Sequence, residues 1–548
     1  MPFVAGRKVP VPAQLEPESQ PVHFPAPTGG WVSAKNPASD GKTPFKLYGP
    51  PAERLENFFP DEVGISVMGG SQQFAAIATA GAFPCESMWQ YIGGTTHKLA
   101  AAGNGKIFDI TTPASTTVPP AADVTGRTTN YYSTQNFATA GGNFLYACND
   151  SDKPLLYNGT TYTAIDGAST PSITGVTTST LSQVNAYKNR LFFVQGGSMN
   201  VWALPVGAVG GAAIQISLAG IFRKGGSVLF TATWSLDAGD GLNANLVIMS
   251  TEGEVAIYNG TDPSSASTWS LVGVYDAPRP MGKNGFCKAA ADLLLVTELG
   301  LIPVSTLRGR DKANLGAYAV SRAIEPDWVY DARTRRSMPW EVVIWANRQR
   351  AIVTNPVTGD TGVTPPWCYV VNTTTGAWCK RTGWNTRCMS LFNDYVYFGT
   401  NSGTVLQMEI TGADNGSPYY PVAVFAWSDL GRPAAQKTIL SVRSQWIVAA
   451  AINPKLSVST DFAISLPAAP NAQPDISAPG VWDTGLWDVS KWDTGTTLTA
   501  FSSGWVSVNM SGSAHAIQVQ MTLGNSVTPN TKLLRVSALV ETGELMIL

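Results

Sequence analysis

The sequence predicts an all-β protein whose largest part is a β-propeller of about six or seven blades. Two observations carry this prediction: a strand-turn-strand pattern that recurs through the middle of the chain, and a composition rich in turn-forming and aromatic residues. Gly (53 residues), Pro (37 residues) and an aromatic content of 10% are typical of short strands joined by tight turns. At 548 residues the chain is long enough to bury sizeable cores without disulfides or structural metals.

The recurring pattern covers residues 85–415, where an apolar run, a polar or glycine turn and a second apolar run follow one another. One apolar anchor per copy gives successive steps of 46, 46, 56, 47, 58 and 44 residues between Leu99, Leu145, Leu191, Val247, Leu294, Ile352 and Val396. A period of about 40 to 50 residues with a hairpin in every unit is typical of propeller blades, which bury their faces only against neighbouring blades. An irregular series of β-sandwiches is the alternative interpretation.

One tetrapeptide, Tyr-Asn-Gly-Thr, repeats verbatim two periods apart, at residues 157–160 and 258–261. An Asn-Gly pair after a strand favours a type I′ hairpin turn, in which both central residues have positive φ. We therefore expect Gly159 and Gly260 to occupy equivalent positive-φ positions in two blades.

The regions on either side of the repeats differ from them in composition. Residues 1–84 are expected to form an N-terminal arm and docking segment, Pro-, Ala- and Ser-rich up to about residue 45, with a short helical turn at residues 52–60 that ends at a proline. Residues 416–548 are expected to form a C-terminal β-sandwich-like distal module. Its strand-like runs are residues 422–427, 439–448, 455–458, 505–508, 516–521 and 533–540.

The charge pattern narrows the class of partner. The chain has 36 basic and 38 acidic residues, a net charge of −2, and only 14% charged residues, where about 25% is usual. No Lys/Arg cluster is long enough to grip nucleic acid, and a charge-poor chain fits a protein whose surface is covered in an assembly. No apolar stretch is long enough to span a bilayer, and residues 1–12 lack the apolar core of a secretion signal. Six cysteines without a Cys-x-x-Cys pair indicate reduced thiols and synthesis in a cytoplasm.

No catalytic, cofactor-binding or metal-binding residue is predicted, and no cofactor is expected. The three histidines, His23, His97 and His515, lie in three different regions, and no catalytic triad or phosphate-binding loop can be assembled from sequence neighbours. Residues 264–270 resemble the Asp-box of sialidase propellers but lack its Asp and Gly, so they are interpreted as a turn. A group of hard oxygen donors could line a calcium loop, but its spacing favours a solvated turn; its members are Asp237, Asp240, Asn243 and Asn245.

Three Trp-Asp pairs five residues apart begin at Trp482, Trp487 and Trp492. Exposed tryptophans stack on sugar rings, and aspartates bind sugar hydroxyls. Tryptophans at this spacing in a Gly/Thr segment also serve as apolar pegs that pin an irregular loop. The peg interpretation is preferred, and the sugar-binding interpretation stays open.

Several segments together resemble the tail nozzle proteins of short-tailed bacteriophages, a group that includes packaged-DNA stabilisation (stopper) proteins. The resemblance spans most of the chain and is weakest at the long Pro-rich spacer before residue 55. It is carried by Gly29-Gly30-Trp31, Arg54-Leu55-Glu56-Asn57-Phe58-Phe59-Pro60, Val67-Met68-Gly69-Gly70, Asn189-Arg190-Leu191-Phe192-Phe193, Glu252-Gly253-Glu254-Val255 with Tyr258, and Gly300-Leu301. The Trp-Asp repeats and residues 505–540 are similar to the distal module of some members.

The resemblance implies a structural virion protein of the phage tail, synthesised in the host bacterial cytoplasm. It implies a closed homohexameric ring below the portal and adaptor proteins, in contact with tail fibres or tailspikes, that conducts and helps retain the genome without sequence-specific DNA binding. Two alternatives remain at this stage. One is a host-glycan-binding adhesin that uses the tryptophans, and the other is a tail-associated propeller glycosidase, which requires two carboxylates across a pocket.

Overall fold

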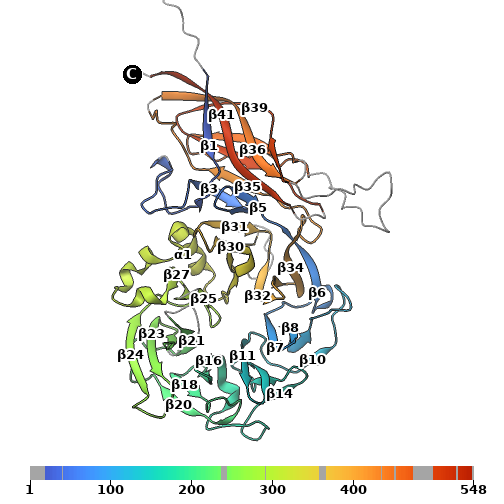
Figure 1. Ribbon diagram of the computed structural model, residues 1–548, viewed down its shortest axis with the longest axis vertical. Coiled ribbons are helices and arrows are strands. Elements are labelled where there is room, and N and C mark those ends of the chain that lie inside the picture. The colour runs from blue at the N-terminus through green and yellow to red at the C-terminus, as the bar shows by residue number, and fades with distance from the viewer. Residues whose placement is uncertain are drawn as a thin grey trace, which may run out of the picture.

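The computed structural model describes residues 19–39, 41–235, 243–289, 292–356, 366–433, 435–449, 452–472, 498–525 and 529–545. These residues form a β-propeller with a β-sandwich above it (Figure 1), which confirms the predicted fold class. The described helices are α1 (Glu325–Thr334) and the 3₁₀ turns η1 (Pro37–Ser39), η2 (Thr79–Gly81), η3 (Thr178–Thr180), η4 (Val304–Leu307), η5 (Lys312–Tyr318), η6 (Arg322–Ile324) and η7 (Ala346–Arg348). None of these helices has the length and apolar character needed to cross a membrane.

Six blades are antiparallel sheets of their own. The first contains β7 (Ser87–Gly93), β8 (Thr96–Gly103), β9 (Lys106–Asp109) and β10 (Ala122–Val124), and the second β11 (Ser133–Thr139), β12 (Gly142–Cys148), β13 (Leu155–Tyr157) and β14 (Tyr162–Ala164). The third contains β16 (Leu181–Tyr187), β17 (Arg190–Gln195), β18 (Asn200–Ala203) and β20 (Ile214–Ser217), and the fourth β21 (Val228–Trp234), β22 (Asn245–Ser250), β23 (Glu254–Gly260) and β24 (Trp269–Asp276). The short strands β15 (Ile173–Thr174) and β19 (Gly211–Ala212) pair with each other.

The last two of these six blades complete most of the ring. The fifth contains β25 (Phe286–Ala289), β26 (Asp292–Thr297) and β27 (Gly300–Pro303), and the sixth β32 (Thr386–Phe392), β33 (Tyr395–Thr400), β34 (Thr404–Thr411) and β6 (Gly70–Ala76). The position between them is filled by β28 (Val342–Trp345), β29 (Arg350–Val353), β30 (Trp367–Asn372) and β31 (Trp378–Thr382), with β28 lying against β25 and β32. These four strands also begin a nine-stranded sheet, so the propeller and the sandwich share a continuous hydrogen-bonded sheet.

The hydrophobic cores lie between blades, as expected for sheets that bury their faces only against one another. One core joins the third and fourth blades through Phe192, Val201, Leu246 and Ala256, and similar cores join the other neighbours. Each blade is therefore stabilised by both neighbours, and the ring needs a closing contact between its last and first members.

The strand β6 provides that closure, because it comes from the N-terminal segment but pairs with β34 at the end of the ring. Its register places Ala76 opposite Thr404 and Ala75 opposite Val405. The propeller therefore starts at about residue 70 and not at the expected residue 85, because one strand of the sixth blade is supplied from before the repeats.

The C-terminal part forms a sandwich of two sheets, one of them the nine-stranded sheet. After β31 that sheet continues through β2 (Gly30–Trp31), β3 (Pro51–Glu56), β35 (Val422–Phe425), β40 (His515–Gln520) and β37 (Lys455–Thr460). The second sheet contains β38 (Thr499–Ser502), β39 (Val506–Gly512), β36 (Ala435–Val448), β41 (Thr531–Leu545), β5 (Ile65–Val67), β4 (Phe58–Pro60) and β1 (Gln20–Pro25). Trp446 and Val442 from one sheet and Ile517 and Val519 from the other belong to one core.

The N-terminal segment is integrated into these sheets. The part of the expected arm that the structure describes supplies five strands to the sandwich, including β1, which pairs with β41 from Gln20–Val540 to Pro25–Arg535. The helical turn expected at residues 52–60 is wrong, since β3 and β4 occupy this stretch. Local helix-forming residues are overridden there by pairing, because β3 lies between β2 and β35 in the sheet interior.

The repeated Tyr-Asn-Gly-Thr segments confirm one expectation and correct another. Gly159 has φ 95° and lies just after β13, the third strand of its blade, whereas Gly260 has φ 142° and is the last residue of β23, the third strand of another. Neither Asn158 nor Asn259 has a positive φ, so these are not type I′ turns. The side-chain oxygen of Asn158 instead accepts hydrogen bonds from the backbone N–H groups of Thr160 and Thr161, at 2.9 and 2.8 Å, which builds a longer turn.

Candidate functional site: an axial pocket

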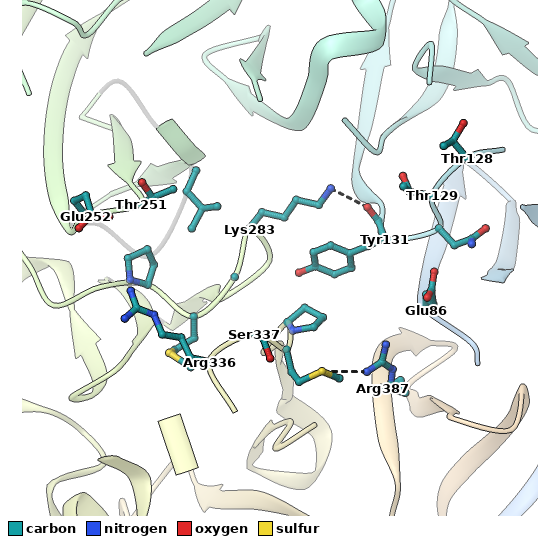
Figure 2. Close-up of a pocket in the computed structure, with 17 residues that line it drawn as sticks. Glu86, Thr128, Thr129, Tyr131, Thr251, Glu252, Lys283, Arg336, Ser337 and Arg387 are labelled. Atoms are coloured by element: carbon teal, nitrogen blue, oxygen red, sulfur yellow. Dashed lines mark hydrogen bonds between the residues drawn. The ribbon is translucent and has the colours of Figure 1, made fainter. Parts of the chain in front are cut away.

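A pocket of about 750 Å³ opens in the middle of the propeller (Figure 2). Most of its walls are segments that precede or begin the first strand of a blade, and these first strands contact one another around the ring. Because its lining comes from blades on several sides of the ring, the pocket lies on the propeller axis. We call it the axial pocket; it is lined by Glu86, Thr128, Thr129, Asn130, Tyr131, Leu229, Thr251, Glu252, Pro280, Met281, Gly282, Lys283, Arg336, Ser337, Met338, Pro339 and Arg387.

The loop between β24 and β25 brings Lys283 to the axis. Backbone hydrogen bonds fix this loop: Met281 N donates to Val296 O at 3.0 Å, and Trp340 N donates to Met281 O at 3.2 Å. The buried Lys283 ammonium donates to Tyr131 O at 2.8 Å and to Ser182 O at 3.0 Å. Lys283 therefore connects the fifth blade to the segment before β11 in the second blade and to β16 in the third blade.

The Lys283 ammonium forms no ion pair among the described residues, although it lies 4.8 Å from the centre of the Tyr131 ring. Burial lowers its pKa to about 8, against the attraction of Asp150 and Glu341. A positive charge held by two carbonyl oxygens and a ring face leaves a positive potential in the lining of the pocket.

The side chain of Tyr131 extends across the pocket between Lys283 and Ser337 (Figure 2). Its hydroxyl is buried and has no hydrogen-bond partner among the described residues. Burial, reinforced by the nearby Glu341 carboxylate, raises the pKa of Tyr131 well above its ordinary value. The hydroxyl therefore stays protonated, and its donor is unused in this structure.

A buried carboxyl group, Glu341, lies beside the axial pocket and contacts two of its neighbouring blades. Its oxygens accept hydrogen bonds from Asn284 Nδ2 at 3.2 Å and from Met389 N at 3.1 Å. Asn284 Nδ2 also donates to Tyr132 O at 3.0 Å, which links the network to the second blade. Burial raises the pKa of Glu341 to about 7, and the two hydrogen bonds to the carboxylate lower it only in part.

Two arginines line the pocket from different sides, and Figure 2 shows Arg336 and Arg387 flanking Ser337. Neither forms an ion pair within the described part of the chain, and Arg387 contacts the sulfur of Met338 at 3.7 Å. Of the two carboxylates in the wall, Glu252 is paired with Arg279, which is outside the lining. Cationic charge therefore exceeds free anionic charge in the pocket.

The candidates considered from the sequence are not brought together by the fold. His23 contacts Ser537 Oγ at 3.0 Å, His97 lies 3.4 Å from the Gln90 amide, and His515 is buried in β40. Within the described ranges no group of three or more His, Cys, Asp or Glu side chains could hold a metal ion. Asp237, Asp240 and the Trp-Asp segment from Trp482 to Asp493 lie outside the described residues, while Asn245 bonds to Asn243 O and Asn259.

The axial pocket was not predicted from the sequence. Its charged residues come from positions 283, 336 and 387, far apart in the chain and in no recognisable motif. The Gly-Lys-Asn-Gly loop at residues 282–285 marks a turn, but only the ring closure shows that this turn faces the axis.

No protein-family model matches the sequence, and no curated protein matches it. Solved structures with a similar arrangement include the computationally designed protein Ika8 (8% identity, TM-score 0.36, 62% of this chain and 99% of that chain). YCF48 from Cyanidioschyzon merolae has 11% identity and a TM-score of 0.36, over 62% of this chain and 98% of that one. The β-propeller domain of Myceliophteria thermophila Cps50 (Swd1) has 10% identity and a TM-score of 0.36, over 62% of this chain and all of that one. These likenesses concern the fold alone, and no functional argument rests on them.

Proposed function

We propose that the protein is a structural subunit of a short-tailed phage tail nozzle, without catalytic activity. In this proposal, copies of the chain form a closed homohexameric ring in the virion, below portal and adaptor proteins and in contact with tail fibres or tailspikes. The genome passes through the bore without being gripped. The observation that carries the proposal is a charge-poor chain with apolar edge strands that a partner would cover.

The first such edge is β24, the outermost strand of the fourth blade, which among the described strands pairs with β23 alone. Leu271, Val272 and Val274 on it are 42%, 42% and 38% exposed. An exposed apolar edge strand presents unpaired backbone groups and apolar side chains, a combination that proteins usually cover or blunt with charge.

A second apolar edge lies on the sandwich, where β36 is the one strand of the described part of the chain that pairs with β39. Trp505, Val506 and Met510 in and beside this strand are 42%, 38% and 36% exposed. The two edges lie on different parts of the molecule, the propeller and the sandwich (Figure 1). Two separate surfaces suit a subunit that contacts a neighbour through more than one part of its fold.

The charge balance supports a conduit. A bore rich in Lys and Arg would bind the phosphate backbone and hold the genome, whereas this chain has 36 basic and 38 acidic residues. Several basic side chains also form internal hydrogen bonds and ion pairs, so they do not face a bore. The fully buried Arg381, for example, bonds to Asp414 Oδ1 at 2.7 Å between the rings of Trp384 and Tyr419.

The first experiment measures the particle and its affinity for DNA. Mass photometry and end-on electron microscopy of the purified protein, alone and with adaptor protein, are expected to show a closed ring. Duplex DNA binding is expected to be weak even at low salt. A stable monomer in assembled virions, or tight binding that falls steeply with salt, would overturn the proposal.

A second experiment tests the β24 edge. The double variant Val272→Lys/Val274→Lys is expected to reduce ring formation strongly, because it places two positive charges in the β24 contact of every subunit. Val118→Lys, at a residue that is 63% exposed in the loop between β9 and β10, is the matched control and is expected to assemble normally. Unchanged assembly of the double variant would exclude β24 as a contact. Cleavage of host polysaccharide abolished by one Asp or Glu substitution would assign the glycosidase alternative instead.

A further inference from the structure

We propose that the axial pocket binds a small organic anion with at least two oxyanion groups, carboxylate or phosphate, held by Arg336 and Arg387. This site goes beyond the nozzle function and does not depend on it, since the pocket is built within one chain.

The two arginines of the axial pocket differ in their partners from an arginine that serves only the fold. An arginine that serves only the fold is usually satisfied by a carboxylate or by carbonyl oxygens, as Arg381 is in this protein. Arg336 is exposed at the pocket, Arg387 is half-buried in its wall, and no carboxylate of the described residues is within ion-pair distance of either. A guanidinium group presents planar, paired N–H donors that match carboxylate and phosphate oxygens.

A third cation and few free carboxylates surround the two arginines. Lys283 adds a third positive charge to the lining, and within the described residues its ammonium contacts two neutral carbonyl oxygens and an aromatic ring. Glu86 and Glu252 are the carboxylates of the lining, and Arg279 already compensates Glu252. Burial raises the pKa of Glu341, beside the pocket, to about 7, although the charges of Arg387 and Lys283 lower it in part. A single negative charge would leave the pocket positive, which favours a ligand with more than one.

The axial pocket has the size and lining of a small-molecule site. A volume of about 750 Å³ is within the roughly 300 to 1,000 Å³ range of small-molecule sites. Leu229, Met281, Met338 and Pro339 supply an apolar part of the wall between the charged groups. The two arginines come from opposite sides of Ser337 (Figure 2), so they can contact separate groups of one ligand. Two separated guanidinium groups with an apolar wall between them favour a compact polyanion with a carbon skeleton over a single inorganic ion.

Isothermal titration calorimetry of the full chain tests the proposal with four probes: citrate, fructose 1,6-bisphosphate, acetate and glucose. We expect citrate or the bisphosphate to bind at a stoichiometry of one per chain, at least tenfold more tightly than acetate, with no detectable binding of glucose. The stronger of the two distinguishes a carboxylate ligand from a phosphate ligand.

Substitutions place the binding in the pocket. Arg336→Gln and Arg387→Gln are each expected to weaken binding at least fivefold, while Arg432→Gln, at an exposed arginine in the loop before β36, leaves it unchanged. Circular dichroism checks that each variant is folded. Equal affinity in all three variants, or no polyanion binding at millimolar concentration, would overturn the proposal.

A spectroscopic readout is independent of affinity. The ε-methyl group of Met338 lies beside Arg387, so its ¹³C-methyl resonance, assigned through Met338→Leu, is expected to shift on addition of the polyanion. A ligand that binds without moving this resonance would place the site elsewhere and exclude the axial pocket.

Discussion

Replacing Glu341 with glutamine is expected to remove a pH-dependent loss of stability from the protein. Glu341 is buried beside the axial pocket, with hydrogen bonds from Asn284 and Met389 but no ion-pair partner among the described residues. Its pKa is raised from 4.5 to about 7 by burial. Between these two values the folded protein holds a proton on Glu341 that the unfolded chain releases.

The sign and size follow from this difference. Because the folded state binds more protons, the free energy of unfolding falls as the pH rises from about 4.5 to about 7. Each pKa unit corresponds to about 1.4 kcal/mol, so the whole shift amounts to about 3 kcal/mol above pH 7. Glutamine does not ionise, so the stability of the Glu341→Gln variant relative to the wild type should be higher at pH 8 than at pH 4.5.

The assay is the urea midpoint of unfolding at half-unit steps from pH 4.5 to 8, followed by tryptophan fluorescence. The exposed Glu62→Gln in the loop between β4 and β5 is the matched control and should keep the wild-type pH dependence. Lys283 does not confuse the result, because its pKa of about 8 lies below the ordinary value of 10.5. Its contribution to stability therefore increases only as the pH rises from about 8 to 10.5. Parallel midpoint curves for wild type and Glu341→Gln would refute the reasoning.

Four further results are expected. Gly260→Val should cost at least about 2 kcal/mol in the free energy of unfolding, since a Cβ at this positive φ would lie 2.0 Å from Thr268 O. Gly159→Val should cost about 1 to 2 kcal/mol, because its nearest neighbour is the end of a side chain; equal melting of both variants and wild type would contradict this. Arg381→Met should cost about 3 to 5 kcal/mol in chemical denaturation, because it removes the cationic partner of the half-buried Asp414 carboxylate, and an unchanged midpoint would count against it. The six cysteines, all free and five of them buried, should react with a thiol reagent far more slowly in the native than in the unfolded protein.

The sequence predicted the propeller well because each blade is local. A hairpin such as β16–β17 is specified by alternating apolar residues and a two-residue turn, and the turn at Lys188 and Asn189 has φ 43° and 55°. Residues 422–427 and 439–448 were likewise expected as strands and overlap β35 and β36. These predictions need only the residues of the strand and its turn.

The N-terminal strands were missed because their structure depends on distant partners. β1 contains Pro21 and Pro25, which are typical of loops, yet an edge strand tolerates them because it needs few of its own N–H groups. β3 contains Glu53, Arg54 and Glu56, which favour helix in isolation, and it becomes a strand because β2 and β35 lie on either side. Neither partner could be identified from the spacing of residues along the chain.

The candidate site depends still more strongly on tertiary structure. Lys283 is informative only because it reaches the backbone of residues 131 and 182, and Arg336 and Arg387 only because the ring brings them to one pocket. Burial, not a motif, sets the titration of Glu341. The sequence around a single charged loop residue does not show whether that residue is buried or which pocket it lines.

The strand pairings at the two ends of the chain also bear on how the protein is made. β6 pairs with β34, which lies more than 300 residues later in the chain, and β1 pairs with β41. Neither the ring nor the second sheet can therefore be completed on a growing chain before β34 and β41 have been translated. Until then the partly formed blades expose unpaired strand edges, and such long-range pairing is slow and prone to aggregation. Synthesis interrupted before residue 404 leaves an open propeller with no partner for β6. The closed surfaces that an ordered assembly needs therefore form only after β41 has been translated. A chain that stops earlier lacks them.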